Sequence, residues 1–126
     1  SRLPKIWHVA CYYRRMIQMS LSICSHSLGA SELVEALRSI MRPAQLDRGC
    51  ASARLYSEIG NPRCFNYVEE WESQEELLCN LRSGRFSRLI AIMEIAAEAP
   101  ALRFSRVLDS DALGLSLRIE ETDFND

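Results

Sequence analysis

The segment FNYVEEWESQEELLCNLRSGRF, residues 65–86, decides the fold because it joins a strand to a helix at a clearly marked point. Its first seven residues are rich in aromatic and β-favouring side chains, which predicts a short strand ending at Trp71. Ser73 lies three residues before Glu76, the spacing of a capping box, in which the serine hydroxyl accepts a hydrogen bond from a free backbone N–H. We therefore expect a helix to begin directly after Ser73.

The region before this segment predicts a strand followed by a helix. From Met16 to Cys24 apolar residues alternate with polar ones, the period of a strand with one apolar face. Ser31 is the expected N-cap of a helix whose apolar residues recur at helical spacing. Pro43 is expected to end that helix, because the residue before a proline disfavours helical backbone angles.

A hairpin is predicted next. Residues 50–58 alternate between two faces, with Arg54 and Tyr56 on the same one. Gly60, Asn61 and Pro62 are residue types typical of a turn. The strand at 50–58 should therefore pair antiparallel with the strand from Cys64 to Trp71.

After the helix capped by Ser73, the sequence predicts a break, a second helix and two strands. Ser83-Gly84 marks the break, and Pro100 is expected to stop the second helix. Alternation predicts strands at 102–108 and 113–120, with a turn at 109–111 between them. The residues expected on the buried face of the second helix are Phe86, Leu89, Ile90, Met93 and Ala97.

The predicted order is β-α-β-β-α-α-β-β, an α+β, ferredoxin-like antiparallel sheet with helices on one face. The other face must meet something, and a second copy of the same sheet is the economical partner. We therefore expect a homodimer, formed through facing sheets and the C-terminal strand. The domain is expected to span residues 16–122. Residues 123–126 form an acidic tail, and residues 1–15 are either an ordered arm or a flexible leader.

Composition restricts the class of protein. The chain has 126 residues, 48% of them hydrophobic and 25% charged, as in a single globular domain. A net charge of −2 gives no electrostatic footprint for nucleic acid. No apolar run approaches the roughly 20 residues of a membrane span, and we expect a cytoplasmic protein without a membrane partner.

Cysteine usage argues against a metal site. The five cysteines form no Cys-x-x-Cys pair. We expect them to be small buried apolar residues in a reducing compartment.

The chain resembles the antibiotic biosynthesis monooxygenase-like domains over roughly residues 16–109. The motifs that carry the resemblance stand in the family's order and spacing: Arg48-Gly49-Cys50, Arg54-Leu55-Tyr56, residues 68–73, Leu81-Arg82-Ser83, Phe86 and Leu102-Arg103-Phe104. The resemblance implies a dimeric α+β barrel with a pocket between the sheet and the helices of each protomer. It also implies oxidation of quinols or phenols by dioxygen without a cofactor, as some members perform.

One departure from the family pattern concerns histidine. Many relatives carry two histidines in the helical stretch that here reads residues 80–86, and both are absent. The histidines of this chain are His8 and His26, so the stretch that would supply an iron ligand for haem degradation offers none.

The candidate site residues are those that an aromatic-binding pocket between sheet and helices requires. Each also has a structural interpretation: core or interface packing for Trp71, cross-strand pairing for the tyrosines and Arg54, and solvent exposure for Asn80 and His26. The catalytic candidates are Trp71, Asn80 and Arg54, and the substrate-binding candidates are Tyr56, Asn66, Tyr67, Phe86 and His26.

Two functions remain open. The first is a cofactor-independent monooxygenase or quinol oxidase acting on a small aromatic substrate. The second is a non-catalytic dimeric module that binds a small apolar ligand. A lined pocket with a polar group facing an aromatic wall would favour catalysis. A pocket filled by its own side chains would favour a binding or structural role.

Overall fold

The computed structural model describes residues 14–110 and 117–121, which form one antiparallel sheet and a helical layer. The elements are β1 (Arg14–Cys24), α2 (Ala30–Leu46), β2 (Cys50–Glu58), β3 (Asn61–Trp71), α3 (Gln74–Asn80), a π-helical turn (Leu81–Arg85), α4 (Phe86–Glu94), β4 (Ala101–Ser110) and β5 (Leu117–Glu121). The predicted acidic tail and most of the predicted leader lie outside the described residues. No helix in the described ranges is long and apolar enough to cross a membrane.

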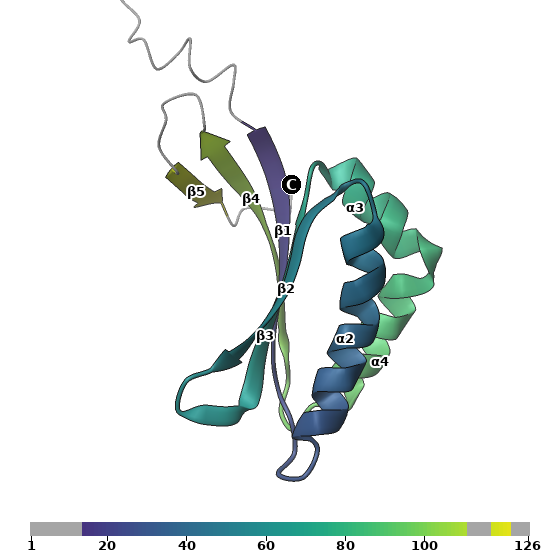
Figure 1. Cartoon of the computed structure of the whole chain (residues 1–126), viewed down its shortest axis with the longest axis vertical. Coiled ribbons are helices and arrows are strands. Elements are labelled where there is room, and N and C mark those ends of the chain that lie inside the picture. Colours follow the sequence, from purple (N-terminus) through teal and green to yellow (C-terminus); the bar gives the residue numbers. More distant parts are fainter. Residues whose placement is uncertain (1–13, 111–116, 122–126) are drawn as a thin grey trace, which may run out of the picture.

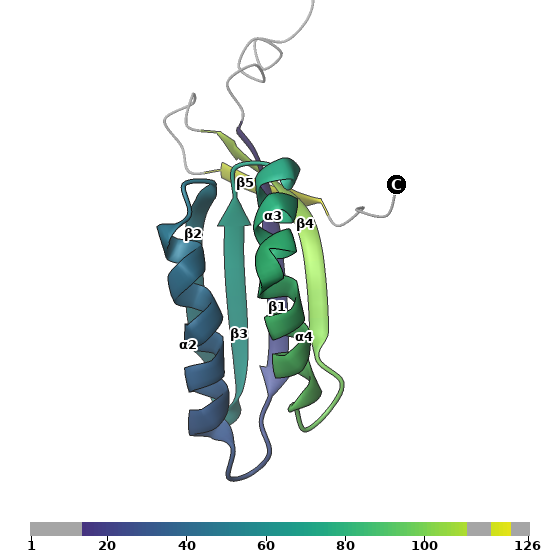
Figure 2. The same cartoon turned by 90° about the vertical axis from the view of Figure 1, so that its right-hand side faces the viewer.

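The sheet has the strand order β2-β3-β1-β4-β5 and is antiparallel throughout. Its first four strands have the predicted ferredoxin-like arrangement, with β5 added beside β4. Figures 1 and 2 show the helices on one face of this sheet, with α3 and α4 following each other end to end and α2 lying beside them. The α+β fold class predicted from the sequence is therefore confirmed.

The core lies between the sheet and the helices. Alternate residues of β1 and β3 face the helical layer, from Ile17 to Ile23 and from Phe65 to Trp71. They pack against Leu33, Leu37 and Ile40 of α2, which are 1% exposed or less. This apolar layer fixes which face of each strand is buried, because a one-residue slip would turn every side chain to the other face.

The local signals that define the central segment are confirmed. The Ser73 hydroxyl accepts a hydrogen bond from the Glu76 backbone N–H at 3.2 Å, which caps α3. The predicted break also occurs, because Gly84 has a φ of 101°, a conformation that favours glycine. The hairpin between β2 and β3 forms as expected, with Gly60 in its turn at a φ of 85°. The predicted extent of the turn was wrong, because Asn61 and Pro62 already belong to β3.

The predicted bounds of α2 were wrong at both ends. The N-cap is Gly29 and not Ser31, and no side chain caps the helix. Pro43 lies inside the helix, which continues to Leu46. The last turn is held by tertiary contacts that outweigh the local preference: Ala44 is fully buried, and the side chain of Gln45 donates to the Ala53 carbonyl at 3.0 Å.

The predicted buried face of α4 was partly wrong. Leu89 and Ile92 are buried, but Phe86 is 45% exposed and Ile90 is 37% exposed. The kink at Gly84 sets the rotation of α4, and Arg85 takes the inward position that Phe86 was expected to occupy. The helix also ends at Glu94, well before Pro100.

At the C-terminal side, β4 continues through Asp109 and Ser110, which were predicted to begin a turn. The expected strand at 113–120 is present as β5 from Leu117 to Glu121. The start of the predicted strand lies outside the described residues.

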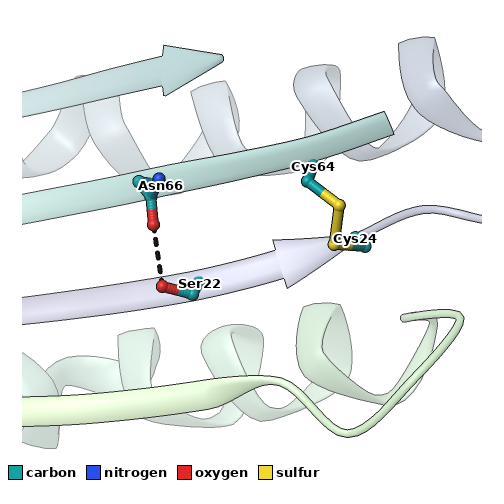
Figure 3. Close-up of a disulfide and its surroundings, with 4 residues drawn as sticks. All are labelled: Ser22, Cys24, Cys64 and Asn66. Atoms are coloured by element: carbon teal, nitrogen blue, oxygen red, sulfur yellow. Dashed lines mark hydrogen bonds between the residues drawn. A yellow bond between two sulfur atoms is a disulfide. The ribbon is translucent and has the colours of Figure 1, made fainter. Parts of the chain in front are cut away.

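The expectation that the cysteines are buried and unbonded was wrong for Cys79, which is exposed, and for two others, which are bonded. Cys24 and Cys64 are direct cross-strand partners on β1 and β3, and they form a disulfide (Figure 3). Beside the disulfide, Ser22 donates to the side-chain oxygen of Asn66 at 2.7 Å, also across the two strands (Figure 3). Spacing along the chain gave no signal for this pair, since 40 residues separate the two cysteines.

Candidate functional site

The most distinctive group between the sheet and the helices is the carboxylate of Glu69, which is 0% exposed. Period two along β3 places Glu69 on the same face as Tyr67 and Trp71, toward the helical layer. Acidic side chains are almost never fully buried unless they are paired. The surroundings of Glu69 must therefore supply hydrogen bonds and a positive charge.

Three side chains meet this requirement. The indole Nε1–H of Trp71 donates to one carboxylate oxygen of Glu69 at 2.9 Å. The Tyr67 hydroxyl donates to the other oxygen. The Arg85 guanidinium forms an ion pair with that same oxygen. The Glu69 carboxylate thus accepts hydrogen bonds from two neutral side chains and forms an ion pair with one cation.

Arg85 is the last residue of the π-helical turn, so the kink between α3 and α4 places it in the interior. One guanidinium nitrogen also donates to the Ile40 carbonyl of α2 at 3.1 Å, and another donates to the side-chain oxygen of Asn80. Its Nε has no hydrogen-bond partner within the described part of the chain. Arg85 therefore ties α2, the turn and β3 together.

The polar contacts continue outward from Asn80 to the end of α2. The Asn80 amide donates to one oxygen of Asp47 at 2.8 Å, and the Gly49 backbone N–H donates to the other at 2.9 Å. A Cβ at Gly49 would lie 2.5 Å from the carboxylate of Glu76, so the loop and α3 approach closely here. We call the group Glu69, Tyr67, Trp71, Arg85, Asn80 and Asp47 the buried network.

The surroundings of Glu69 raise the pKa of two weakly acidic side chains, Tyr67 within the buried network and Cys50 beside it. Burial, and then the negative charge of Glu69, raises the pKa of Tyr67 far above its usual value. Burial and Glu69 also raise the pKa of the Cys50 thiol to about 11. Both groups therefore stay protonated at neutral pH, and Tyr67 acts as a hydrogen-bond donor to the carboxylate.

The structure brings three predicted site residues together and separates the others. Tyr67, Trp71 and Asn80 belong to the buried network. Arg54, Tyr56 and Asn66 lie on the opposite face of the sheet. There Arg54 and Tyr56 line a shallow hollow of about 270 Å³ together with Gln18, Ser52, Val68 and Glu70.

The last two predicted residues lie elsewhere. His26 is exposed in the turn between β1 and α2. Phe86 lines an open pocket of about 320 Å³ on the outer side of the π-helical turn, with Leu78, Leu81 and Arg82. The surface of this pocket is almost wholly apolar. We call it the kink pocket.

The roles of Glu69, Arg85 and Asp47 were not predicted from the sequence. A signal for Glu69 was present, because period two places this acid between Tyr67 and Trp71 on one face. A signal for Arg85 was also present, because it stands in the stretch where many of the domains that the sequence resembles carry histidines. No local pattern pointed to Asp47, which lies 33 residues from Asn80.

The described residues contain no group of three or more His, Cys, Asp or Glu side chains arranged to hold a metal ion. The cations of the candidate site are guanidinium groups, which hold anions and not metals.

No family model matches the sequence, and no curated protein does either. Solved structures do match. An antibiotic biosynthesis monooxygenase matches with a TM-score of 0.61 at 15% identity, covering 70% of this chain and 94% of its own. A conserved protein from Bacteroides thetaiotaomicron, described as a possible oxidoreductase, matches with a TM-score of 0.65 at 17% identity, covering 74% and 98%. Protein SO0527 from Shewanella oneidensis matches with a TM-score of 0.67 at 16% identity, covering 75% and 93%. The chain therefore has the fold of the antibiotic biosynthesis monooxygenases.

Proposed function

We propose that this chain, which has the antibiotic biosynthesis monooxygenase fold, oxidises a small quinol or polyphenol with dioxygen and without a cofactor. The observation that carries the proposal is the kink pocket, which joins an almost wholly apolar surface and an aromatic wall, Phe86, to the side chain of Arg82. An electron-rich phenol needs apolar contact and a ring to stack on, and in this proposal the guanidinium of Arg82 is the cation for its deprotonated oxygen.

The proposed chemistry begins with loss of the phenol proton to solvent. The Arg82 guanidinium favours the phenolate, because a nearby positive charge lowers the pKa of an acid. The phenolate passes one electron to dioxygen, and the resulting phenoxyl radical and superoxide combine at a ring carbon. The peroxide anion takes a proton from solvent, and its outer oxygen then leaves as water together with the hydrogen of the same ring carbon, which gives a quinone. One oxygen atom of dioxygen ends in the quinone and the other in water, so the substrate supplies every electron.

The buried network fixes the backbone turn that carries residues of this pocket. Leu81 and Arg82 belong to the same π-helical turn as Arg85, whose guanidinium is fixed by Glu69, Asn80 and the Ile40 carbonyl. A turn held at three points keeps the pocket residues in one geometry, as a site for a positioned substrate requires. Arg85 is thus a positioning residue in this proposal.

Oxygen consumption tests the proposal. Metal-stripped protein is assayed with a panel of quinols and polyphenols, and uptake above autoxidation is expected. Arg82→Met should lower the rate, and Phe86→Ala should raise KM. Arg88→Met is the matched control, since Arg88 is an exposed arginine on α4 that does not line the pocket. Uptake that is equal in Arg82→Met and in the unmodified chain would contradict the proposal.

A specific observation favours the second candidate function, a non-catalytic module that binds a small apolar ligand. The space between sheet and helices around Trp71 is filled by the chain's own side chains, Tyr67, Glu69 and Arg85 among them. Binding of a quinol to the kink pocket, measured by fluorescence quenching, without any oxygen uptake would select this function over the enzyme.

In either case we propose a homodimer through the outer face of the sheet and the C-terminal strand. The described side chains on that face are mostly polar, so an interface there would be rich in hydrogen bonds and bridging water. Sedimentation of Val68→Glu tests this, because Val68 lies on that face in the middle of β3. Arg88→Glu on α4 is the control. A monomeric unmodified chain would contradict the proposal.

A further inference from the structure

A second pocket lies where β1 ends, α2 begins and α4 ends. Figures 1 and 2 show that these three ends lie together, at the opposite end of the helical layer from α3. Its volume is about 560 Å³. This is within the range of small-molecule sites, roughly 300–1,000 Å³. It is lined by Ser25, His26, Ser27, Leu28, Gly29, Glu32, Leu33 and Ile95, none of which belongs to the buried network or the kink pocket.

Two independent features of this pocket favour a negatively charged group. The first is the N-terminus of α2, a helix of 17 residues with Gly29 as its N-cap and no side-chain cap. The first N–H groups of a helix lack intrahelical partners and lie at the positive end of its dipole. An anion at this position would be stabilised by both effects.

The second feature is the hydroxyl of Ser25. This residue is 3% exposed, lines the pocket, and its Oγ has no hydrogen-bond partner within the described ranges. Its Cβ lies 3.9 Å from the position that a Cβ at Gly29 would take, so the side chain lies beside the helix start. An unpaired buried hydroxyl is costly, and a ligand that accepts its hydrogen bond would remove the cost.

The remaining lining restricts the kind of anion. Glu32 lies in the first turn of α2, and α4 ends at the pocket with its carbonyl end, so negative charge is also present. Two of the α4 carbonyls, those of Ile92 and Met93, already accept hydrogen bonds. A ligand with a single negative charge is therefore favoured over a dianion. Leu28 is 95% exposed and Ile95 is 49% exposed, which offers apolar contact beyond the helix terminus.

We propose that this pocket binds a small monocarboxylate with an apolar body. Its carboxylate accepts from the first N–H groups of α2 and from the Ser25 hydroxyl, and its apolar part covers Leu28 and Ile95. The exposed imidazole of His26 provides a further N–H donor at the rim. The site is independent of the proposed oxidation, since it shares no residue with the kink pocket.

Benzoate is a suitable probe, with benzamide as its neutral counterpart and inorganic phosphate as the dianion. The amide signals of Ala30, Ser31 and Glu32 are followed by NMR during each titration. Saturable shifts are expected with benzoate, and weaker binding is expected with the other two. Equal responses to benzoate and benzamide, tighter binding of phosphate, or shifts confined to the kink pocket would each overturn the proposal.

Two variants test the residues. Ser25→Ala should weaken benzoate binding about tenfold, the loss expected for one hydrogen bond to a charged group. Glu32→Gln should strengthen it, and this exposed residue can be changed without disturbing the core. Ser57→Ala is the control, an exposed serine on β2 that does not line the pocket. Unchanged affinity in both Ser25→Ala and Glu32→Gln would overturn the proposal, whatever the outcome of the oxygen assay.

Discussion

The carboxylate of Glu69 and the guanidinium of Arg85 form an ion pair from which solvent is almost fully withdrawn, with side-chain exposures of 0% and 8%. Such a pair adds little net stability over an apolar pair, because both ions lose their hydration. Removing one partner is much more costly, since the other charge is left buried and unpaired. This asymmetry gives the first prediction.

We expect Arg85→Met to lower the free energy of unfolding by about 3–5 kcal/mol, measured by urea denaturation. In a double-mutant cycle with Glu69→Gln, the double variant should lose less than the sum of the two single variants. Arg88→Met, at an exposed position, should change stability very little. Additive losses at the two positions would show that the buried pair does not couple them.

Tyr67 should remain protonated in the folded protein well beyond the pH at which ordinary tyrosines ionise, because its pKa is raised by burial and by Glu69. The folded state binds this proton more tightly than the unfolded state, so stability should fall as the pH rises above about 10. The ultraviolet absorbance of tyrosinate measures this. The tyrosinate absorbance of Tyr67 should appear only when the protein unfolds, and Tyr67→Phe should remove that part of the signal.

Cys50 should react slowly with iodoacetamide at neutral pH, because burial and Glu69 raise the pKa of its thiol to about 11. Cys79 is free and exposed, and should be labelled before Cys50. Mass spectrometry of partly labelled protein distinguishes the two. The folded state holds the Cys50 proton more tightly, so this residue should contribute a loss of stability as the pH rises from about 9 toward 11. Equal labelling rates in the folded protein would contradict this prediction.

Much of the fold is predictable from local patterns. The alternation in β1, the β-favouring residues of β3 and the Ser73 cap depend on neighbouring residues, and each predicted the right element, although β3 begins at Asn61 and not at Cys64. The error at Pro43 has a different origin, because the last turn of α2 is held by contacts with β2 that no local pattern reveals. Local signals are informative where propensity and packing agree, and they fail where packing overrides propensity.

The candidate site is harder to predict for the same reason. Period two places Glu69 beside Tyr67 and Trp71, but it does not tell which face of the sheet the helices cover. Arg85 becomes an interior residue only through the backbone rotation at Gly84. Asn80 and Asp47 meet from distant parts of the chain, and so do Cys24 and Cys64.

The disulfide gives a further prediction. Linking Cys24 to Cys64 restricts the unfolded chain across a separation of 40 residues, which in the chain-entropy estimate stabilises the fold by about 4 kcal/mol. Cys24→Ser with Cys64→Ser should lower the urea midpoint, and a reducing agent should then have no further effect. Cys79→Ser is the matched control and should leave the midpoint unchanged. A midpoint of the unmodified chain that is insensitive to reductant would contradict this prediction.

Two glycines should respond to alanine for different reasons. In Gly49→Ala the new Cβ would meet the Cβ of Glu76 at 2.8 Å, and overpacking of this kind costs about 1–3 kcal/mol. Glu76→Ala should recover part of that loss, because it removes the outer contacts. In Gly84→Ala the Cβ meets nothing within 4 Å, so the loss is backbone strain of about 1–2 kcal/mol. Glu76→Ala should not recover the second loss, and thermal denaturation of the four variants tests the difference.

The kink at Gly84 has an evolutionary consequence. Each residue of an α-helix turns the next by about 100°. Deleting one residue from the turn Leu81–Arg85 would therefore bring the aromatic ring of Phe86 opposite Glu69, in place of the Arg85 guanidinium. A single-codon deletion would therefore leave the buried carboxylate of Glu69 without its cation, as Arg85→Met does, without any substitution. When homologues are aligned across this turn, the residues of the following helix should accordingly be matched by the direction in which their side chains face, and not only by their position in the sequence.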